Sequence, residues 1–125
     1  MSETELAWAA GFFDGEGCSY MLKSTSSGTA RRVYSAFRLA VAQVELQPLE
    51  RFMRALGFGR INGPYQQKKA SRRPHYQWCV SGMDAVSAIE AMWPYLSEPK
   101  RAQAQVNLEL YKAQCDLPRK VNQYG

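Results

Sequence analysis

The stretch Leu6–Gly17, Leu-Ala-Trp-Ala-Ala-Gly-Phe-Phe-Asp-Gly-Glu-Gly, constrains the fold of this chain more than any other. Nearly every residue before Asp14 is apolar, so a helix formed by this stretch must be buried on almost all sides. The helix would then end in two carboxylates, Asp14 and Glu16, although negative charge is unfavourable at the carbonyl end of a helix. We therefore expect a positive group or hydrogen-bond donors close to this turn.

The start of the same helix carries a capping signal. Ser2 and Glu5 have the spacing of a capping box, in which each side chain accepts a hydrogen bond from the other residue's backbone N–H. Small residues follow along one side of the helix, and they allow a second helix to approach its backbone closely. The residues of this predicted contact are Ala7, Ala10, Gly11 and Asp14.

The length of the chain fits one domain with its own core, because 125 residues and a hydrophobic content of 46% are ordinary for a single globular unit. We expect this domain over residues 1–114 and a loosely ordered tail over residues 115–125. No apolar run approaches the ~20 residues of a membrane span, and no basic segment precedes an apolar one at the N-terminus. We therefore expect an intracellular protein, cytoplasmic or associated with the nucleoid.

The cysteines argue against a disulfide framework or a zinc finger. Cys18, Cys79 and Cys115 are odd in number and far apart, and His75 is the only histidine. We expect reduced thiols that pack as small apolar groups.

The charge is positive and unevenly distributed. The net charge is +5 and the pI is about 9.3. Acidic residues are missing between Glu16 and Glu45 and again between Glu50 and Asp84, while lysines and arginines are frequent in both intervals. Two long basic segments without acids indicate a surface that faces phosphates.

The order of helical and strand patterns predicts an α+β fold. Strand patterns cover residues 18–23, 31–43, 59–66 and 75–81, and they form two hairpins. Helical patterns cover residues 2–16 and 48–56, then a stretch that Ser81 caps and Pro94 ends, and finally one that Ser97 caps and Pro99 begins. The resulting order, α-β-β-α-β-β-α-α, predicts an antiparallel sheet with helices on one face and an exposed opposite face.

Three stretches resemble a known family. Ala9–Gly17 resembles the LAGLIDADG motif of homing endonucleases, with alanine where leucine is usual at its first position. Val41-Ala42-Gln43 resembles the strand end that holds a polar residue near the active site of that family. Lys100–Ala104 resembles the Lys-x-x-Gln-Ala sequence that opens its last helix. The likeness covers about Leu6 to Leu110.

The resemblance implies the LAGLIDADG homing-endonuclease fold, in which a four-stranded antiparallel sheet lies along the DNA major groove. It implies a site-specific double-stranded DNA endonuclease that hydrolyses phosphodiester bonds with a divalent metal, of the kind associated with intron or intein mobility. Chains with a single motif form homodimers, so a long, nearly palindromic target with short 3′ overhangs after cutting is expected. The expected ion is Mg²⁺, with Mn²⁺ as a substitute, whereas Ca²⁺ is expected to bind without supporting cleavage.

The resemblance also assigns roles within the site. Glu16 and the Gly15 carbonyl are the implied metal ligands, Lys100 neutralises charge near the phosphate, and Gln43 orients water. Asp14 is either a second acid or a capping residue that hydrogen-bonds across the helix pair. The basic residue that often follows the glutamine in this family is replaced by Val44-Glu45, which leaves the second basic group of the site unassigned.

A larger set of residues is expected to contact DNA through the exposed face and the hairpin loops. Arginine suits guanine, and asparagine or glutamine suits adenine, in the major groove. The alternative for each is an ordinary solvent-exposed side chain. The set is Tyr20, Lys23, Arg31, Arg32, Tyr34, Arg38, Arg60, Asn62, Lys68, Lys69, Arg72, Arg73, His75 and Gln77.

Two other functions stay open at this level. A relative without catalytic activity could assist RNA splicing as a maturase or regulate transcription by binding DNA. A protein-interaction module is the second alternative, and the two basic hairpins argue against it. The expected partners are double-stranded DNA and a second copy of the chain, with no membrane and no small-molecule substrate.

Overall fold

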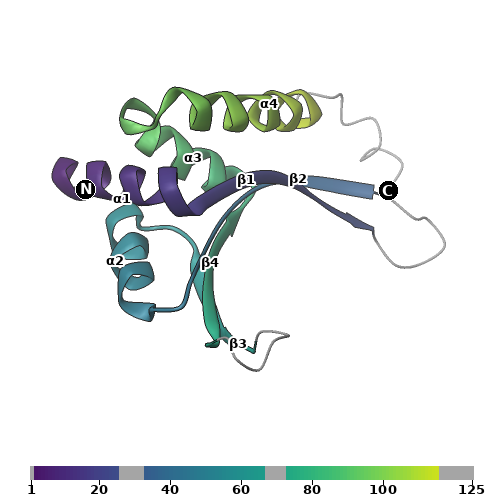
Figure 1. The fold of residues 1–125 in the computed structure, drawn as a ribbon. Coiled ribbons are helices and arrows are strands. Elements are labelled where there is room, and N and C mark those ends of the chain that lie inside the picture. The colour runs from purple at the N-terminus through teal and green to yellow at the C-terminus, as the bar shows by residue number, and fades with distance from the viewer. Residues whose placement is uncertain (1, 26–32, 67–72, 116–125) are drawn as a thin grey trace.

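The computed structural model describes residues 2–25, 33–66 and 73–115, and its element order confirms the predicted α+β fold (Figure 1). The helices within these residues are α1 (Glu3–Glu16), α2 (Leu46–Leu56), α3 (Met83–Met92) and α4 (Glu98–Cys115), with a 3-10 turn η1 (Trp93–Tyr95) before the last. The strands are β1 (Gly17–Thr25), β2 (Val33–Gln43), β3 (Arg60–Tyr65) and β4 (His75–Ser81). None of the helices in this described part of the chain is long and apolar enough to cross a membrane.

The strands form one antiparallel sheet in the order β1-β2-β4-β3. Figure 1 shows the helices on one side of this curved sheet, while the other side is open. Gly17, the first residue of β1, lies opposite Val41, so the end of α1 comes to the same end of the sheet as the last residues of β2. This pairing positions the acidic turn beside the strand end that contains Gln43.

Side-chain alternation along β2 and β4 builds the core on the helix side of the sheet. Phe37, Leu39 and Val41 of β2 are buried against the helices, as the sequence pattern predicts. Trp78 of β4 is fully buried, and its ring meets Phe52 of α2 edge to face at a centroid distance of 4.7 Å. Burial of side chains of this size stabilises the fold by about 1.5–3 kcal/mol each relative to exposure.

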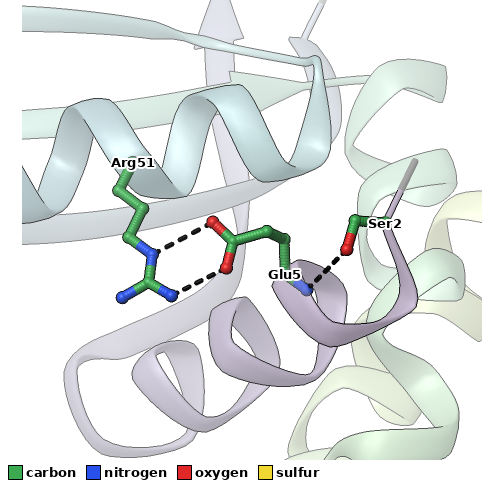
Figure 2. Close-up of polar contacts among 3 residues, drawn as sticks. All are labelled: Ser2, Glu5 and Arg51. Carbon is green, nitrogen blue, oxygen red and sulfur yellow. Dashed lines mark hydrogen bonds and ion pairs between the residues drawn. The ribbon is translucent and has the colours of Figure 1, made fainter.

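The predicted capping box at the start of α1 is half right, as Figure 2 shows. The backbone N–H of Glu5 donates to Ser2 Oγ at 3.3 Å, which confirms Ser2 as the cap. The Glu5 carboxylate instead accepts two hydrogen bonds from Arg51 of α2, at 3.1 and 2.7 Å. The Arg51 guanidinium also lies 3.9 Å from the centroid of the Trp8 ring. The interaction joins α1 to α2, which the local sequence pattern alone does not reveal.

The Arg51 ion pair has an electrostatic consequence for Glu5. The hydrogen bonds from Arg51 lower the pKa of the Glu5 carboxyl below its usual value of 4.5. The same hydrogen bonds raise the pKa of the Arg51 guanidinium. Both groups therefore hold their charges when paired.

Of the two serines predicted to cap the last two helices, the structure confirms one. Ser81 remains in β4, and α3 begins after Gly82, whose φ of 71° is a left-handed value that favours glycine. The prediction that Ser81 caps this helix was therefore wrong. The predicted cap of α4 is confirmed, because Ser97 O accepts from Arg101 N at 3.0 Å and Ser97 Oγ accepts from Lys100 N at 3.4 Å.

Candidate active site and nucleic-acid interface

The acidic turn at the end of α1 presents Glu16 to solvent. Glu16 is the last residue of α1 and is exposed, and its carboxylate makes no hydrogen bond or ion pair with any other residue in the described parts of the chain. The preceding Gly15 is also exposed, and a Cβ placed there would meet nothing within 4 Å. A carboxylate and a backbone carbonyl are thus accessible at the same turn, and both are the oxygen ligands that Mg²⁺ prefers.

Gly17 keeps this turn tight. A Cβ at Gly17 would lie 2.2 Å from Cδ1 of Phe13, which no real contact allows. Phe13 is fully buried and stacks on Phe52 at a centroid distance of 6.4 Å, so its ring has little room to move. The chain can therefore turn from α1 into β1 over the Phe13 ring because residue 17 is glycine.

Lys100 reaches this turn from the first turn of α4. Its Nζ donates to the carbonyl oxygen of Gly17 at 2.8 Å and lies 5.7 Å from the centroid of the Phe13 ring. A lysine at the start of a helix is disfavoured by the helix dipole, and the carbonyl and the ring face offset that cost. The result is an ammonium group beside the backbone of the residue that follows Glu16.

Asp14 joins α1 to α4. Both of its carboxylate oxygens lie 3.1 Å from the backbone nitrogen of Ser97, and the Ser97 hydroxyl donates to Oδ1 at 3.0 Å. The Asp14 charge, unfavourable at the carbonyl end of α1, lies at the amino end of α4, where the dipole favours it. This geometry supports the capping interpretation of Asp14 and supplies the donors that the sequence led us to expect.

Gln43 ends β2 at the same end of the sheet. It lies opposite Tyr76 of β4, two residues beyond the Val41–Gly17 pair. Ala42, Gln43, Val44 and His75 line a shallow hollow of about 270 Å³. Since neighbouring strands are ~4.8 Å apart, the structure brings Glu16, Lys100 and Gln43 to one end of the sheet.

The open face of the sheet carries most of the predicted base-reading residues. Tyr20, Arg38 and Ser81 lie in one row across β1, β2 and β4. Cross-strand neighbours point to the same face, so the register places Arg60 with Cys79 and Asn62 with Gln77 in the following rows. This geometry agrees with the face predicted for Arg38, Arg60, Asn62, His75 and Gln77.

A hollow of about 480 Å³ lies within this face, and Arg38, Arg60 and Asn62 contribute to its lining. Ser81 and Asp84 line it too, although the sequence reading gave neither a binding role. Ser81 had been assigned to a helix cap, and Asp84 is an acid in the first turn of α3. Ser81 continues the alternation of His75, Gln77 and Cys79 in the predicted strand, and this pattern places it on the open face.

One predicted DNA contact lies on the wrong face. Lys23 pairs with Ser35, and its odd-numbered neighbour Met21 pairs with the buried Phe37, so Lys23 belongs to the helix side of the sheet. Residues 18–23 show no clear alternation of apolar and polar side chains, so the sequence does not determine which of them face the helices. Tyr20 and Lys23 were therefore both predicted to contact DNA. Only Tyr20 shares the open face.

The structure describes the remaining predicted contacts to different extents. For Tyr34 the structure describes only the backbone, which pairs with Ser24. His75 begins β4, and its ring lies 5.6 Å from that of Tyr65. Arg73 lies within the described residues, just before β4, and bonds to Glu45. The other members of the predicted set lie outside the described residues; they are Arg31, Arg32, Lys68, Lys69 and Arg72.

The small residues that are exposed on α1 are not the same set as the residues of the predicted dimer contact. Ala10 is fully buried inside its own chain, so it is not available to a partner and its assignment to the dimer contact was wrong. Asp14 is engaged by Ser97. The exposed small residues are Ala7, Gly11 and Gly15, spaced four apart and therefore on one side of the helix.

No protein-family model and no curated protein matches this chain. Solved structures do match it. The homing endonuclease I-CvuI bound to the I-CreI target in the presence of Mg is 26% identical, with a TM-score of 0.70 over 88% of this chain and 67% of that one. I-CvuI with its own target and Ca is 27% identical, with a TM-score of 0.70 over 87% of this chain and 66% of that one.

A third solved structure is similar to this chain in fold. The archaeal intron-encoded homing endonuclease I-Vdi141I, complexed with DNA, is 21% identical, with a TM-score of 0.65 over 92% of this chain and 71% of that one. This chain spans about two thirds of the length of the I-CvuI chains that it matches. Together with the motif at Ala9–Gly17, these likenesses show that the chain has the LAGLIDADG homing-endonuclease fold and is similar to members of that family.

Proposed function

We propose that this protein is a homodimeric, magnesium-dependent endonuclease that cuts both strands of a long, nearly palindromic DNA site. The observation that carries the proposal is the juxtaposition of the exposed Glu16 carboxylate with the Lys100 ammonium, which binds the Gly17 carbonyl at 2.8 Å. These two oppositely charged residues lie at the end of a sheet whose open face carries arginine and amide side chains. DNA on that face would bring its backbone to the acidic turn.

The residues of the turn fit a hard divalent ion. The Glu16 carboxylate and the Gly15 carbonyl are two accessible oxygen donors, and magnesium typically takes one or two carboxylates and completes its shell with water and phosphate oxygens. When bound, such an ion supplies Lewis-acid polarisation of the phosphate and lowers the pKa of coordinated water. The I-CvuI structures, solved with Mg or Ca and DNA, support this choice of ion.

The protein groups then have separate tasks in hydrolysis. Glu16 adds negative charge that attracts the ion to the turn. Lys100, fixed by the Gly17 carbonyl and the Phe13 ring, holds a positive charge where the phosphate gains negative charge during attack. Gln43 can donate and accept at the strand end, which suits an amide that orients the attacking water.

The number of reacting centres that a duplex cut requires is the reason for proposing a homodimer. Each chain carries one Glu16, whereas cutting a duplex requires two reacting centres. Ala7, Gly11 and Gly15 form an exposed row of small residues on α1, and a Cβ added at Gly11 or Gly15 would meet no side chain or neighbouring element within 4 Å. A second α1 could approach this row closely, and two-fold symmetry would bring both acidic turns together.

The experiment that tests this function compares the wild-type protein with Glu16→Gln on a DNA target. Glu16 is exposed and makes no hydrogen bond or ion pair within the described chain, so the variant should keep its melting temperature and its affinity for DNA. Cleavage with Mg²⁺ should fall to background. Cleavage at the wild-type rate would exclude Glu16 as the metal ligand, and DNA binding without cutting by the wild-type protein would favour the maturase or regulator alternative.

A further inference from the structure

An ion pair lies close to the strand end that holds Gln43. Nη2 of Arg73, just before β4, lies 2.7 Å from Oε1 of Glu45, just after β2. Glu45 lies at the end of the first of the two acid-free basic segments, which face phosphates in the proposed function. A lone carboxylate there would repel DNA, and Arg73 offsets its charge.

The strand register locates this pair relative to the active end of the sheet. Glu45 follows Gln43 by two residues, and Arg73 precedes Tyr76, the partner of Gln43, by three. His75, between Arg73 and Tyr76, lines the hollow that also contains Gln43 and Val44. The Arg73–Glu45 pair is therefore adjacent in sequence to the residues that line that hollow, and it lies at the same end of the sheet as Glu16.

The pair is exposed enough for a phosphate to compete with Glu45. The side chains of Arg73 and Glu45 are 70% and 65% exposed, and ion pairs at such exposure contribute little to folding stability. A guanidinium matches the geometry of phosphate oxygens as well as that of a carboxylate. Exchanging Glu45 for a DNA phosphate would therefore cost the protein little.

We propose that Arg73 is the second cationic residue of the active end and binds the DNA phosphate next to the cleaved bond, with Glu45 holding it in place until DNA arrives. The inference rests on the proposed function and adds to it a specific cation contributed by β4. Lys100 reaches the acidic turn from α4, whereas Arg73 lies beyond Gln43, just before the start of β4. The reacting phosphate would then have positive charge on two sides.

The test separates binding from the chemical step. Single-turnover cleavage is measured on a duplex that the wild-type protein cuts, with enzyme in excess, for the wild type, Arg73→Gln and Lys112→Gln. Loss of one group that stabilises the developing charge should slow cleavage of bound DNA by about tenfold or more in Arg73→Gln. Lys112 lies on α4 in an exposed pair with Glu90 at 3.7 Å, so Lys112→Gln should keep cleavage of bound DNA within about threefold of wild type.

The role of Glu45 is tested by Glu45→Gln. Removing the competing carboxylate should tighten binding to a random-sequence duplex, whereas Arg73→Gln should weaken binding and reduce the slope of log affinity against log salt by about 0.9. Melting temperatures should be close to wild type in both variants because the pair is exposed. An unchanged affinity in Glu45→Gln would overturn the proposed exchange.

The two proposals fail in different ways. A wild-type protein that cuts no DNA refutes the endonuclease function, and the salt slope of Arg73→Gln then still decides whether Arg73 contacts phosphate. A wild-type protein that cuts DNA, with Arg73→Gln cutting bound DNA equally fast, refutes only the role of Arg73.

Discussion

The Nζ atom of Lys100 donates a 2.8 Å hydrogen bond to the carbonyl oxygen of Gly17, one residue beyond Glu16. Two elements that are more than eighty residues apart in sequence thus meet at one turn, with Asp14 and Ser97 joining them a few residues away. The position of the ammonium is set by a backbone atom, so it does not depend on the exposed Glu16 side chain. This arrangement suits a cation that must be in place before DNA binds.

The first prediction concerns the charge of Lys100. Lys100→Met keeps an unbranched apolar stem against Phe13 and removes the ammonium, so cleavage should fall by about 10²-fold or more while the melting temperature changes little. Lys112→Met is the matched control, because Lys112 lies on the same helix in an exposed pair with Glu90 at 3.7 Å. Single-turnover kinetics and thermal melts of both variants check this. Equal cleavage rates in the two variants would contradict the role of Lys100.

The second prediction concerns the turn itself. Gly17→Ala places a methyl group 2.2 Å from the buried Phe13 ring, and forcing extra volume into a packed core costs about 1–3 kcal/mol. Gly15→Ala is the control, because its added methyl would meet nothing within 4 Å. Urea unfolding at a low, fixed protein concentration measures both. If Gly17→Ala unfolds at the same urea concentration as Gly15→Ala, the Phe13 ring does not impose glycine at this position.

The third prediction concerns the proposed dimer contact. Gly11→Leu should stabilise the isolated helix, because glycine in a helix interior is disfavoured by about 0.5–1 kcal/mol and the site is open. The same side chain would block the close approach of a second α1. Sedimentation equilibrium should therefore show a monomer for Gly11→Leu and a dimer for Ala102→Leu, a substitution at an exposed position of α4. A dimer for both would remove this face of α1 from the interface.

The fourth prediction concerns pH and the contact between α1 and α2. Because the pKa of Glu5 is lowered in the folded state, its pair with Arg51 contributes stability above the unfolded pKa and loses it as the pH falls through the folded pKa. Glu5→Gln should melt below wild type at neutral pH, and the difference should shrink as the pH falls below 4.5. Thermal melts across this range measure the difference. A difference that does not change with pH would mean that the charge of Glu5 is unimportant.

The sequence predicted those features that depend on local pattern. The strand His75–Ser81 has the predicted bounds, Gly57 ends α2 in a left-handed conformation with φ of 77°, and Ser97 caps α4. Each depends on residue alternation or on one residue's backbone preference, and both can be read from neighbouring residues.

The errors arose where distant parts of the chain decide the outcome. Ala10 fits a small-residue face on α1, yet packing inside its own chain buries it and moves the exposed row to Ala7, Gly11 and Gly15. The carboxylate of Glu5 pairs with Arg51, forty-six residues away, instead of the nearby cap. Neither partner can be identified from local periodicity, since the choice is made when the helices pack.

Selection of cut sequences from a randomised duplex pool tests the proposed endonuclease most directly. The wild-type protein is incubated with the pool in Mg²⁺ and separately in Ca²⁺, with Glu16→Gln as the matched control, and cleaved ends are sequenced. We predict one family of nearly two-fold symmetric sites with short 3′ overhangs, recovered only from the wild-type protein in Mg²⁺. Recovery of no cut sequence by a folded, DNA-binding wild-type protein, or equal recovery with Glu16→Gln, would contradict it.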